Sequence, residues 1–313
     1  MKISLVCVFV ILAITWGAGC SSGDGEQSDK ASSSARDSGR PTVYVVNYPL
    51  QYFAERIAGE FASVHFPAPS EVDPAFWKPG AGAVGRYQQA DLILLNGATY
   101  AKWIPQVSLP ASKLINTSEG FRDRYIALEE ATTHTHGPGG EHAHAGTAFT
   151  TWLDMTLAVE HARTVGAAFA RTWPDGNAAF EANFNALETE LLELDHDLRA
   201  IAEMNPQQLF VASHPVYQYL ARRYGLNLES VHWEPDEIPS DIQWNELMSV
   251  LEHHPAAWMI WEGEPPPEVT ERLESIGVQS IVFDPCANTP ETGDFLDVMR
   301  ANVENLKSAF AKP

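Results

Sequence analysis

The feature that most constrains the fold is an uninterrupted stretch, residues 178–204, that contains neither proline nor glycine. A helix over these residues would be about 40 Å long, at 1.5 Å per residue. The preceding Pro174-Asp-Gly sequence is typical of a helix start. Such a helix is long enough to connect two lobes, although the pattern is also typical of an ordinary amphipathic core helix, and periodicity does not decide between the two readings.

Short strand-like runs alternate with helical stretches on both sides of this long stretch. The strand-like runs are residues 41–47, 63–66 and 90–97, then 208–213, 258–261 and 279–283, and the helical stretches are 50–61, 216–224 and 267–276. Alternating strands and helices predict parallel βαβ units. We therefore predict an α/β fold with two parallel-sheet lobes, 41–173 and 205–313, joined by one long bridging helix, 174–204. We expect a ligand cleft between the lobes.

The N-terminal residues resemble an export signal. Lys2 precedes the apolar run 3–14, which is shorter than the roughly 20 residues of a membrane-spanning helix. Gly17-Ala-Gly-Cys20 resembles a bacterial lipobox, except that lipoboxes usually carry Leu where Gly17 stands. We predict a signal peptide at 1–19, a lipid-anchored Ser/Gly-rich linker at 20–40 with Cys20 acylated, and an exported, periplasmic or cell-surface lipoprotein. The alternative is an ordinary signal peptide with an incidental cysteine.

The charge of the chain excludes one large class of partners. Its 20 Lys and Arg residues face 41 Asp and Glu, for a formal net charge of −21. A nucleic-acid-binding protein needs a basic surface to displace counterions from phosphates. We expect no nucleic-acid partner.

A histidine-rich segment, 132–146, contains four imidazoles within eleven residues: His134, His136, His142 and His144. Its proline and glycines predict an irregular loop. Short histidine tracts commonly capture Zn²⁺, Cu²⁺ or Ni²⁺ weakly. The alternative is a solvated linker whose histidines bind nothing.

The order of several motifs resembles the extracytoplasmic metal-binding proteins of zinc and manganese ABC importers, above all the zinc branch with its histidine-rich loop. The motifs are Val72-Asp-Pro-Ala75, Ala90-Asp-Leu92 with Asn96-Gly97, Thr150-Thr-Trp-Leu-Asp154, His214, Trp261-Glu262 and Phe283-Asp-Pro285. The resemblance implies a monomeric, non-enzymatic binding protein that captures a divalent metal and delivers it to an ABC permease in the membrane. It implies Zn²⁺ as the transported metal, with Mn²⁺ as an alternative.

Two of the four metal-ligand positions that the resemblance implies are substituted. Ala75 and Thr150 stand where the family has histidines, whereas His214 and Asp284 remain at the third and fourth positions. Glu262 is a further carboxylate candidate. We expect Glu71 and Asp73, near position 75, and His142 and His144, upstream of position 150, to be the donors that could compensate. A stable Zn²⁺ site takes four such donors.

Two other functions remain open on these residues. Phe76, Trp77, Trp152 and Trp233 could line a cleft for another small ligand or a metal chelate, although aromatic residues more often pack in cores. The histidine-rich loop could also act as a metal buffer or an interaction segment. We expect no catalysis, because the sequence contains no Gly-x-Ser-x-Gly, P-loop or His-Glu-x-x-His motif. We expect His161, His196 and His232 on helix surfaces or loops.

Overall fold

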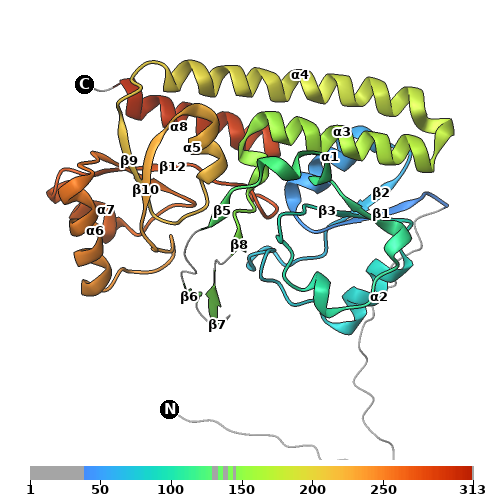
Figure 1. The fold of residues 1–313 in the computed structure, drawn as a ribbon, viewed down its shortest axis with the longest axis horizontal. Coiled ribbons are helices and arrows are strands. Elements are labelled where there is room, and N and C mark those ends of the chain that lie inside the picture. The colour runs from blue at the N-terminus through green and yellow to red at the C-terminus, as the bar shows by residue number, and fades with distance from the viewer. Residues whose placement is uncertain (1–38, 129–132, 137–139, 144–145, 312–313) are drawn as a thin grey trace, which may run out of the picture. The chain divides into compact units, whose positions relative to one another are not determined.

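The computed structural model describes residues 39–128, 133–136, 140–143 and 146–311, and within them two four-stranded sheets organise the chain (Figure 1). The first sheet contains β1 (Thr42–Val45), β2 (Ser63–His65), β3 (Leu92–Leu95) and β4 (Leu114–Asn116). The second contains β9 (Leu209–Ala212), β10 (Asn227–Ser230), β11 (Trp258–Trp261) and β12 (Gln279–Val282). All neighbouring strands in both sheets are parallel. This confirms the predicted pair of α/β lobes.

The two sheets share one strand order. It is β2-β1-β3-β4 in the first and β10-β9-β11-β12 in the second, so that the first strand of each sheet lies between the second and the third. The chain therefore reverses its winding direction between β1 and β3, and again between β9 and β11. In open parallel sheets, ligands bind beyond the carboxyl ends of the strands at such a switch point. We call the parts built on these sheets the N-terminal and the C-terminal lobe.

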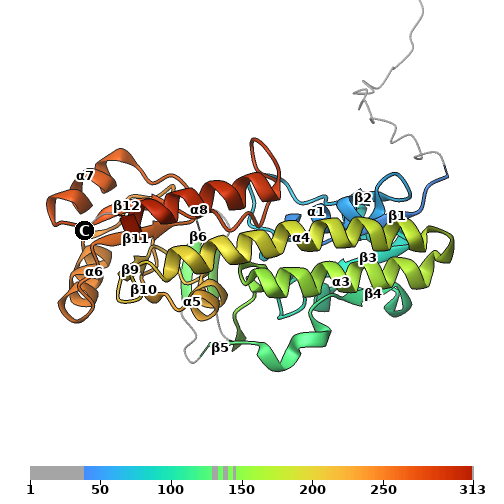
Figure 2. The ribbon, with the colours of Figure 1, turned by 90° about the horizontal axis from the view of Figure 1, so that it is seen from above.

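The long helix α4 (Asn177–Ala202) runs past both lobes. It packs against α1 (Tyr48–Ala58) and α3 (Met155–Thr172) of the N-terminal lobe, and against α5 (Gln218–Tyr224) and α8 (Phe295–Ala311) after it. Figure 2 shows α3 and α8 on opposite sides of α4. The predicted bridging helix is confirmed, and α8 runs beside it. The residue boundaries predicted for the lobes stay predictions.

The remaining elements are short. The helices are α2 (Ala81–Gln89), α6 (Asp241–His253) and α7 (Pro267–Ser275), and the short 3-10 segments are Ile104–Gln106, Ala111–Lys113, Glu119–Arg124, Thr151–Leu153 and Pro174–Gly176. Strand β5 (Ala127–Leu128) pairs with β8 (Gly146–Thr147) in antiparallel fashion. No helix among the described residues is both long enough and apolar enough to cross a membrane.

The histidine-rich segment contains regular structure, which corrects the expectation of an irregular loop. Strands β6 (Thr133–His136) and β7 (Gly140–Ala143) form an antiparallel pair in which His134 lies opposite His142. The alternating Thr-His sequence of β6 suits a strand, and proline and glycine gather between the two strands, where a turn is expected. The predicted donor His144 lies outside the described residues, as do the signal peptide and Cys20, and the side chains of β6 and β7 are not described.

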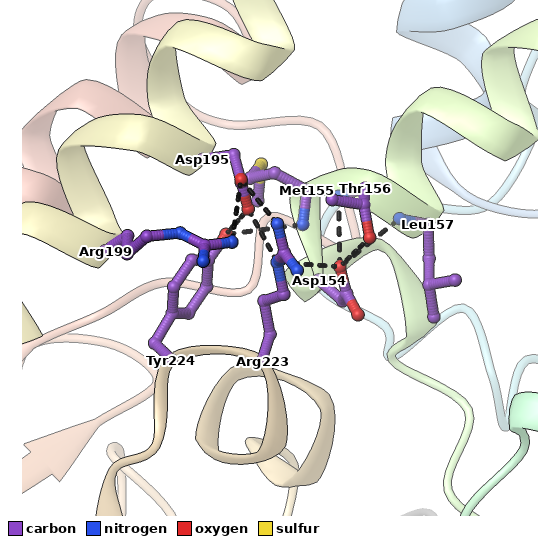
Figure 3. Close-up of polar contacts among 8 residues, drawn as sticks. All are labelled: Asp154, Met155, Thr156, Leu157, Asp195, Arg199, Arg223 and Tyr224. Atoms are coloured by element: carbon purple, nitrogen blue, oxygen red, sulfur yellow. Dashed lines mark hydrogen bonds and ion pairs between the residues drawn. The ribbon is translucent and has the colours of Figure 1, made fainter.

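An ion-pair network joins the long helix to both lobes (Figure 3). Arg223 of α5 forms a bidentate pair with Asp195 of α4, with Nε–Oδ1 and Nη2–Oδ2 distances of 2.8 and 2.6 Å. Its Nε also lies 3.7 Å from Oδ1 of Asp154 in the N-terminal lobe. The Tyr224 hydroxyl donates to Asp195 Oδ1 at 3.1 Å. Burial raises the pKa of Asp195, but the hydrogen bonds and charge of Arg223 outweigh it and lower that pKa overall.

Asp154, the other carboxylate beside Arg223, also starts a helix. Asp154 is the N-cap of α3, and its Oδ1 accepts from the backbone N–H groups of Thr156 at 3.0 Å and Leu157 at 3.4 Å (Figure 3). These bonds satisfy two of the N–H groups that a helix start leaves unpaired. Arg223 therefore connects a cap of the N-terminal lobe, the long helix and the C-terminal lobe.

We expect Arg223→Met to lower the free energy of unfolding by about 2–3 kcal/mol, because the nearly buried carboxylates of Asp195 and Asp154 lose the cation that lies between them and Asp195 loses its bidentate hydrogen bonds. Methionine keeps most of the packed aliphatic stem. Arg199→Met is the matched control, since the Arg199 side chain is 48% exposed and lies 3.6 Å from Asp195. It should cost at most about 0.5 kcal/mol. Urea unfolding of both variants checks this, and equal losses would contradict it.

His161 lies in the core, so its expected place on a surface is wrong. It is 1% exposed and lies between two hydroxyls, with Nδ1 2.7 Å from Thr117 Oγ1 and Nε2 2.8 Å from Thr151 Oγ1. The Thr117 hydroxyl donates its proton to the carbonyl of Leu95, so towards His161 this hydroxyl is the acceptor and Nδ1–H is the donor. The other ring nitrogen, Nε2, then accepts from the Thr151 hydroxyl. Burial lowers the pKa of His161 to about 3. The imidazole is therefore neutral in the folded protein.

This burial predicts a pH dependence. Between pH 6.5 and 3 the unfolded chain binds a proton at His161 that the folded chain does not, so stability is lost as pH falls through this window. We expect the stability difference between metal-free wild type and His161→Gln to shrink by about 2 kcal/mol from pH 7 to pH 5. Urea unfolding at each pH checks this, with exposed His253→Gln as the control. Parallel profiles for wild type and His161→Gln would contradict it.

Candidate functional site

Four ionisable side chains follow the four strands of the second sheet. His214 comes after β9, Glu234 after β10, Glu262 after β11 and Asp284 after β12. Because the carboxyl ends of parallel strands meet at one edge, the strand order places His214 between Glu234 and Glu262. His214 Nδ1 lies 3.0 Å from Glu262 Oε1, and its Nε2 lies 3.5 Å from Glu234 Oε1. The structure thus brings together the predicted His214, Glu262 and Asp284 and adds Glu234.

The charge of His214 depends on these neighbours. Its side chain is 4% exposed. Burial disfavours the imidazolium, but the carboxylates of Glu262, Glu234 and Asp73 outweigh burial and raise the pKa of His214. The ring of His232 lies edge-to-face at a centroid distance of 6.1 Å, so this histidine also lies beside the site. An acidic cluster around one imidazole is therefore arranged to hold positive charge.

Asp284 is held by the last helix. Its backbone N–H donates to Asn302 Oδ1 at 2.9 Å, and Asn302 Nδ2 donates to its carbonyl at 2.7 Å. Its Oδ1 accepts from the backbone N–H of Cys286 at 2.6 Å. Burial raises the pKa of Asp284, the Cys286 N–H opposes that shift, and Glu262 adds to it, with a net rise. The carboxylate is thus fixed in a region that favours a nearby cation.

These side chains line a cavity of about 340 Å³ between the lobes. The N-terminal lobe contributes the loop after β2, with the predicted stand-ins Glu71 and Asp73, and also Tyr100, Phe149, Thr150 and Trp152. Glu71 and Asp73 are exposed and lie on the cavity wall. They are the described carboxylates that the N-terminal lobe places there.

The two substituted positions contribute no metal donor. Ala75 is fully buried and does not line the cavity. Thr150 does line it, but its hydroxyl donates to the carbonyl of Val216 in the C-terminal lobe. Thr150 therefore links the two lobes through a hydrogen bond.

The four aromatic candidates separate into one cavity residue and three packing residues. Trp152 lines the cavity, and its Nε1 donates to Pro285 O at 2.8 Å. Trp233 is buried against Trp244 and Trp261. Phe76 and Trp77 pack partly buried against the core and do not line the cavity.

Glu234 and Tyr100 were not predicted from the sequence. Glu234 follows β10, a strand that was not predicted. Recognition of that strand would have indicated Glu234, because the other three site residues also follow strand ends. Tyr100 follows the predicted strand 90–97 and its Asn-Gly end by three residues.

Within the described residues, no group of three or more His, Cys, Asp or Glu side chains is arranged as it would be around a metal ion.

Comparison with known proteins identifies the family. A family model described as zinc-uptake complex component A, periplasmic, matches residues 43–309. The chain belongs to this family. Membership confirms the predicted resemblance to zinc-importer binding proteins. It also confirms the prediction that the chain is not an enzyme, since the family is a component of an uptake system.

Individual relatives agree with this assignment. The high-affinity zinc uptake system protein ZnuA of Bacillus subtilis is 27% identical over 299 residues, which cover 91% of this chain and 92% of that protein. The zinc-binding lipoprotein AdcA of Streptococcus pneumoniae is 25% identical over 280 residues, or 86% of this chain and 56% of AdcA. The chain thus spans about half the length of AdcA.

Solved structures share the fold. The metal-dependent lipoprotein YcdH of Bacillus subtilis aligns with a TM-score of 0.73 and 22% identity, over 86% of this chain and 99% of YcdH. The Zn(II)-bound ZnuA-like domain of Streptococcus pneumoniae AdcA aligns with a TM-score of 0.72 and 23% identity, over 88% of this chain and all of that domain. At this identity the likeness concerns the fold.

We expect Thr150→Val to lower the free energy of unfolding by about 1–2 kcal/mol, because the carbonyl of Val216 loses its donor. Thr164→Val is the matched control, because the Thr164 hydroxyl bonds to the Glu160 carbonyl of its own helix. Zn²⁺ affinity should change less than about threefold, because the Thr150 hydroxyl is already hydrogen-bonded to Val216 O. Urea unfolding and chelator competition measure both quantities, and a large loss of affinity would make Thr150 a ligand.

Proposed function

We propose that this chain is the extracytoplasmic solute-binding component of an ABC importer and that it captures a divalent metal in the interlobe cavity. The observation that supports this most directly is the convergence of His214, Glu234, Glu262 and Asp284 at one sheet edge. Neutral imidazole and carboxylate oxygen are established ligands of Zn²⁺. The captured ion is then delivered to a permease in the membrane.

Zinc is the first candidate because the family and the named relatives are zinc-uptake or zinc-binding proteins. The donor set favours a second candidate as well. One imidazole among carboxylates is richer in oxygen than a set of three histidines, and oxygen donors suit Mn²⁺. Mn²⁺ is therefore the alternative cargo.

The N-terminal segment and the histidine-rich segment also have roles in this proposed function. A relative named as a lipoprotein supports acylation of Cys20 and a membrane tether, with the binding domain outside the cytoplasm as a monomer. The histidine-rich segment 132–146 would raise the local metal concentration. The alternative role of this segment as an independent metal buffer predicts binding without His214.

His214→Ala should lower Zn²⁺ affinity by about 100-fold or more, because it removes the imidazole at the centre of the cluster. His253→Ala is the matched control, since the His253 side chain is 61% exposed and pairs with Glu229 on the surface. Competition of the mature protein with a chromophoric chelator measures both affinities. Equal Zn²⁺ affinities of the two variants would contradict metal binding in the cavity.

A loop-replacement variant separates the two roles of the histidine-rich segment. Residues 132–144 are replaced by a short glycine linker, which the β5–β8 pairing can accommodate at its base. One-to-one binding that survives this change and depends on His214 supports the cavity. Binding that is lost with the segment but is indifferent to His214→Ala assigns the metal to the segment and contradicts the importer site.

A further inference from the structure

We infer that Asn288 is a positioning residue of the metal cavity, whose side-chain amide holds the acidic loop of the N-terminal lobe, residues 69–73, against the cavity and thereby slows release of the metal. This role rests on the proposed function, because the cavity is the same one. Asn288 lines that cavity and follows the candidate ligand Asp284 by four residues. It adds to the capture of the metal a residue that governs its retention.

One amide nitrogen of the C-terminal lobe bonds to three carbonyls of this loop. Asn288 Nδ2 donates to the carbonyl oxygens of Pro69 at 2.7 Å, Val72 at 2.8 Å and Ser70 at 3.2 Å. Since an amide group has two N–H donors, one of them is shared between two carbonyls. Its Oδ1 accepts from the backbone N–H of Thr289 at 2.8 Å, which fixes the end of the amide that faces the loop. Asn288 therefore directs both its donors across the boundary between the lobes.

The segment before Asn288 is itself anchored to the N-terminal lobe. Pro285 O accepts from Trp152 Nε1 at 2.8 Å, and Ala287 O accepts from the backbone N–H of Tyr48 at 3.0 Å. Both partners are buried, Tyr48 at the start of α1 and Trp152 in a 3-10 segment. The amide of Asn288 thus extends from a part of the chain whose position is fixed by two buried elements.

The acidic loop, by contrast, lies in a stretch without helix or strand. Residues 66–80, between β2 and α2, contain only turns and bends. Four of the five residues of the acidic loop are exposed, and the fifth, Val72, is half-buried. Segments with exposed backbone and few buried contacts are those that open locally in a folded protein. The position of this loop therefore depends on bonds to its neighbours, and the Asn288 amide provides three.

The loop brings negative charge to a cavity that is already acidic. Glu71 and Asp73 line the same cavity as the carboxylates that follow β10, β11 and β12. These like charges repel one another unless a cation is near, whereas a bound dication attracts all of them. The metal and Asn288 therefore favour the same position of the loop, and Asn288 helps to maintain that position when the metal is absent.

Loss of the Asn288 bonds affects release more than capture. Without these bonds the loop leaves the cavity wall more often, and each departure removes the attraction of Glu71 and Asp73 for the ion and opens the wall to water. Entry of the ion is still favoured by the carboxylates of the C-terminal lobe, which the sheet edge holds in place. A loop that is ordered before the metal arrives also costs less free energy on binding than one that the metal must order.

The first measurement is hydrogen–deuterium exchange of the metal-free mature protein. Peptides that cover residues 69–76 report on the loop, because the N–H groups of Val72, Ala75 and Phe76 are hydrogen-bonded within it. We expect Asn288→Ala to speed exchange there by about tenfold, as two or three hydrogen bonds are lost. Zn²⁺ should restore much of the protection.

Asn305→Ala is the matched control for this measurement. Asn305 Nδ2 also donates to a main-chain carbonyl, that of Val282, at 3.0 Å, but this bond lies within the C-terminal lobe. Exchange of residues 69–76 should be the same in this variant as in the wild type. An equal increase in both variants would show a general loss of stability and would contradict a specific attachment of the loop through Asn288.

The second measurement is Zn²⁺ dissociation from the loaded protein, followed in stopped flow with an excess of chelator. Asn288→Ala should raise the dissociation rate constant by about tenfold and change the association rate constant less than about threefold, whereas Asn305→Ala should change neither. Unchanged loop exchange, or an unchanged dissociation rate, in Asn288→Ala that still binds zinc overturns the role of Asn288 and leaves the proposed function intact. Wild-type zinc binding that is indifferent to His214→Ala overturns the proposed function and the role of Asn288 with it.

Discussion

The site depends on backbone pairing at the carboxyl edge of the second sheet. The ladders continue past the assigned strands, since Ser213 N–H donates to Ile260 O at 2.8 Å and Trp233 N–H donates to Ser213 O at 2.7 Å. The segments that carry His214, Glu234 and Glu262 are therefore held by main-chain bonds, and short side-chain distances follow from the sheet. Asn302 holds the fourth segment in the same way through the backbone of Asp284. A site built on strand ends keeps its geometry better than one built on free loops.

Holding several carboxylates together costs free energy unless a positive charge is near. In the structure, His214 occupies the centre of the cluster, and the pKa shifts of His214 and Asp284 both move toward the less negative state of the site. A cation that binds there relieves the repulsion among Glu234, Glu262 and Asp284. The same repulsion that makes the cluster of carboxylates costly therefore supplies part of its affinity for a cation.

The sequence predicts this arrangement as far as its strands could be recognised. Residues His214, Glu262 and Asp284 follow apolar runs that mark β9, β11 and β12. Strand β10 has the polar sequence Asn-Leu-Glu-Ser at the sheet edge, where alternation is weak, so both it and Glu234 escaped prediction. The position of Tyr100 depends on three consecutive left-handed residues, two of which are not glycine, and no propensity indicates that turn.

His161 also shows what could and could not be predicted from the sequence. His161 lies four residues from both Leu157 and Val165 on the buried stripe of α3, so helical periodicity contained the signal for its burial. What the sequence did not show was that Thr117 and Thr151, from two other segments, would satisfy both ring nitrogens. Burial of a polar group is decided by partners that are distant in sequence.

Direct contacts join the two lobes near Thr150. In the arrangement that the family resemblance implies, histidines of one lobe and donors of the other meet on the metal, so the ion itself connects the lobes. Here Thr150 bonds to Val216 O, the Tyr219 hydroxyl donates to Ala148 O at 3.0 Å, and Arg223 lies between Asp154 and Asp195. These contacts join the lobes without a ligand, and the separation of the cavity walls is therefore set by the protein.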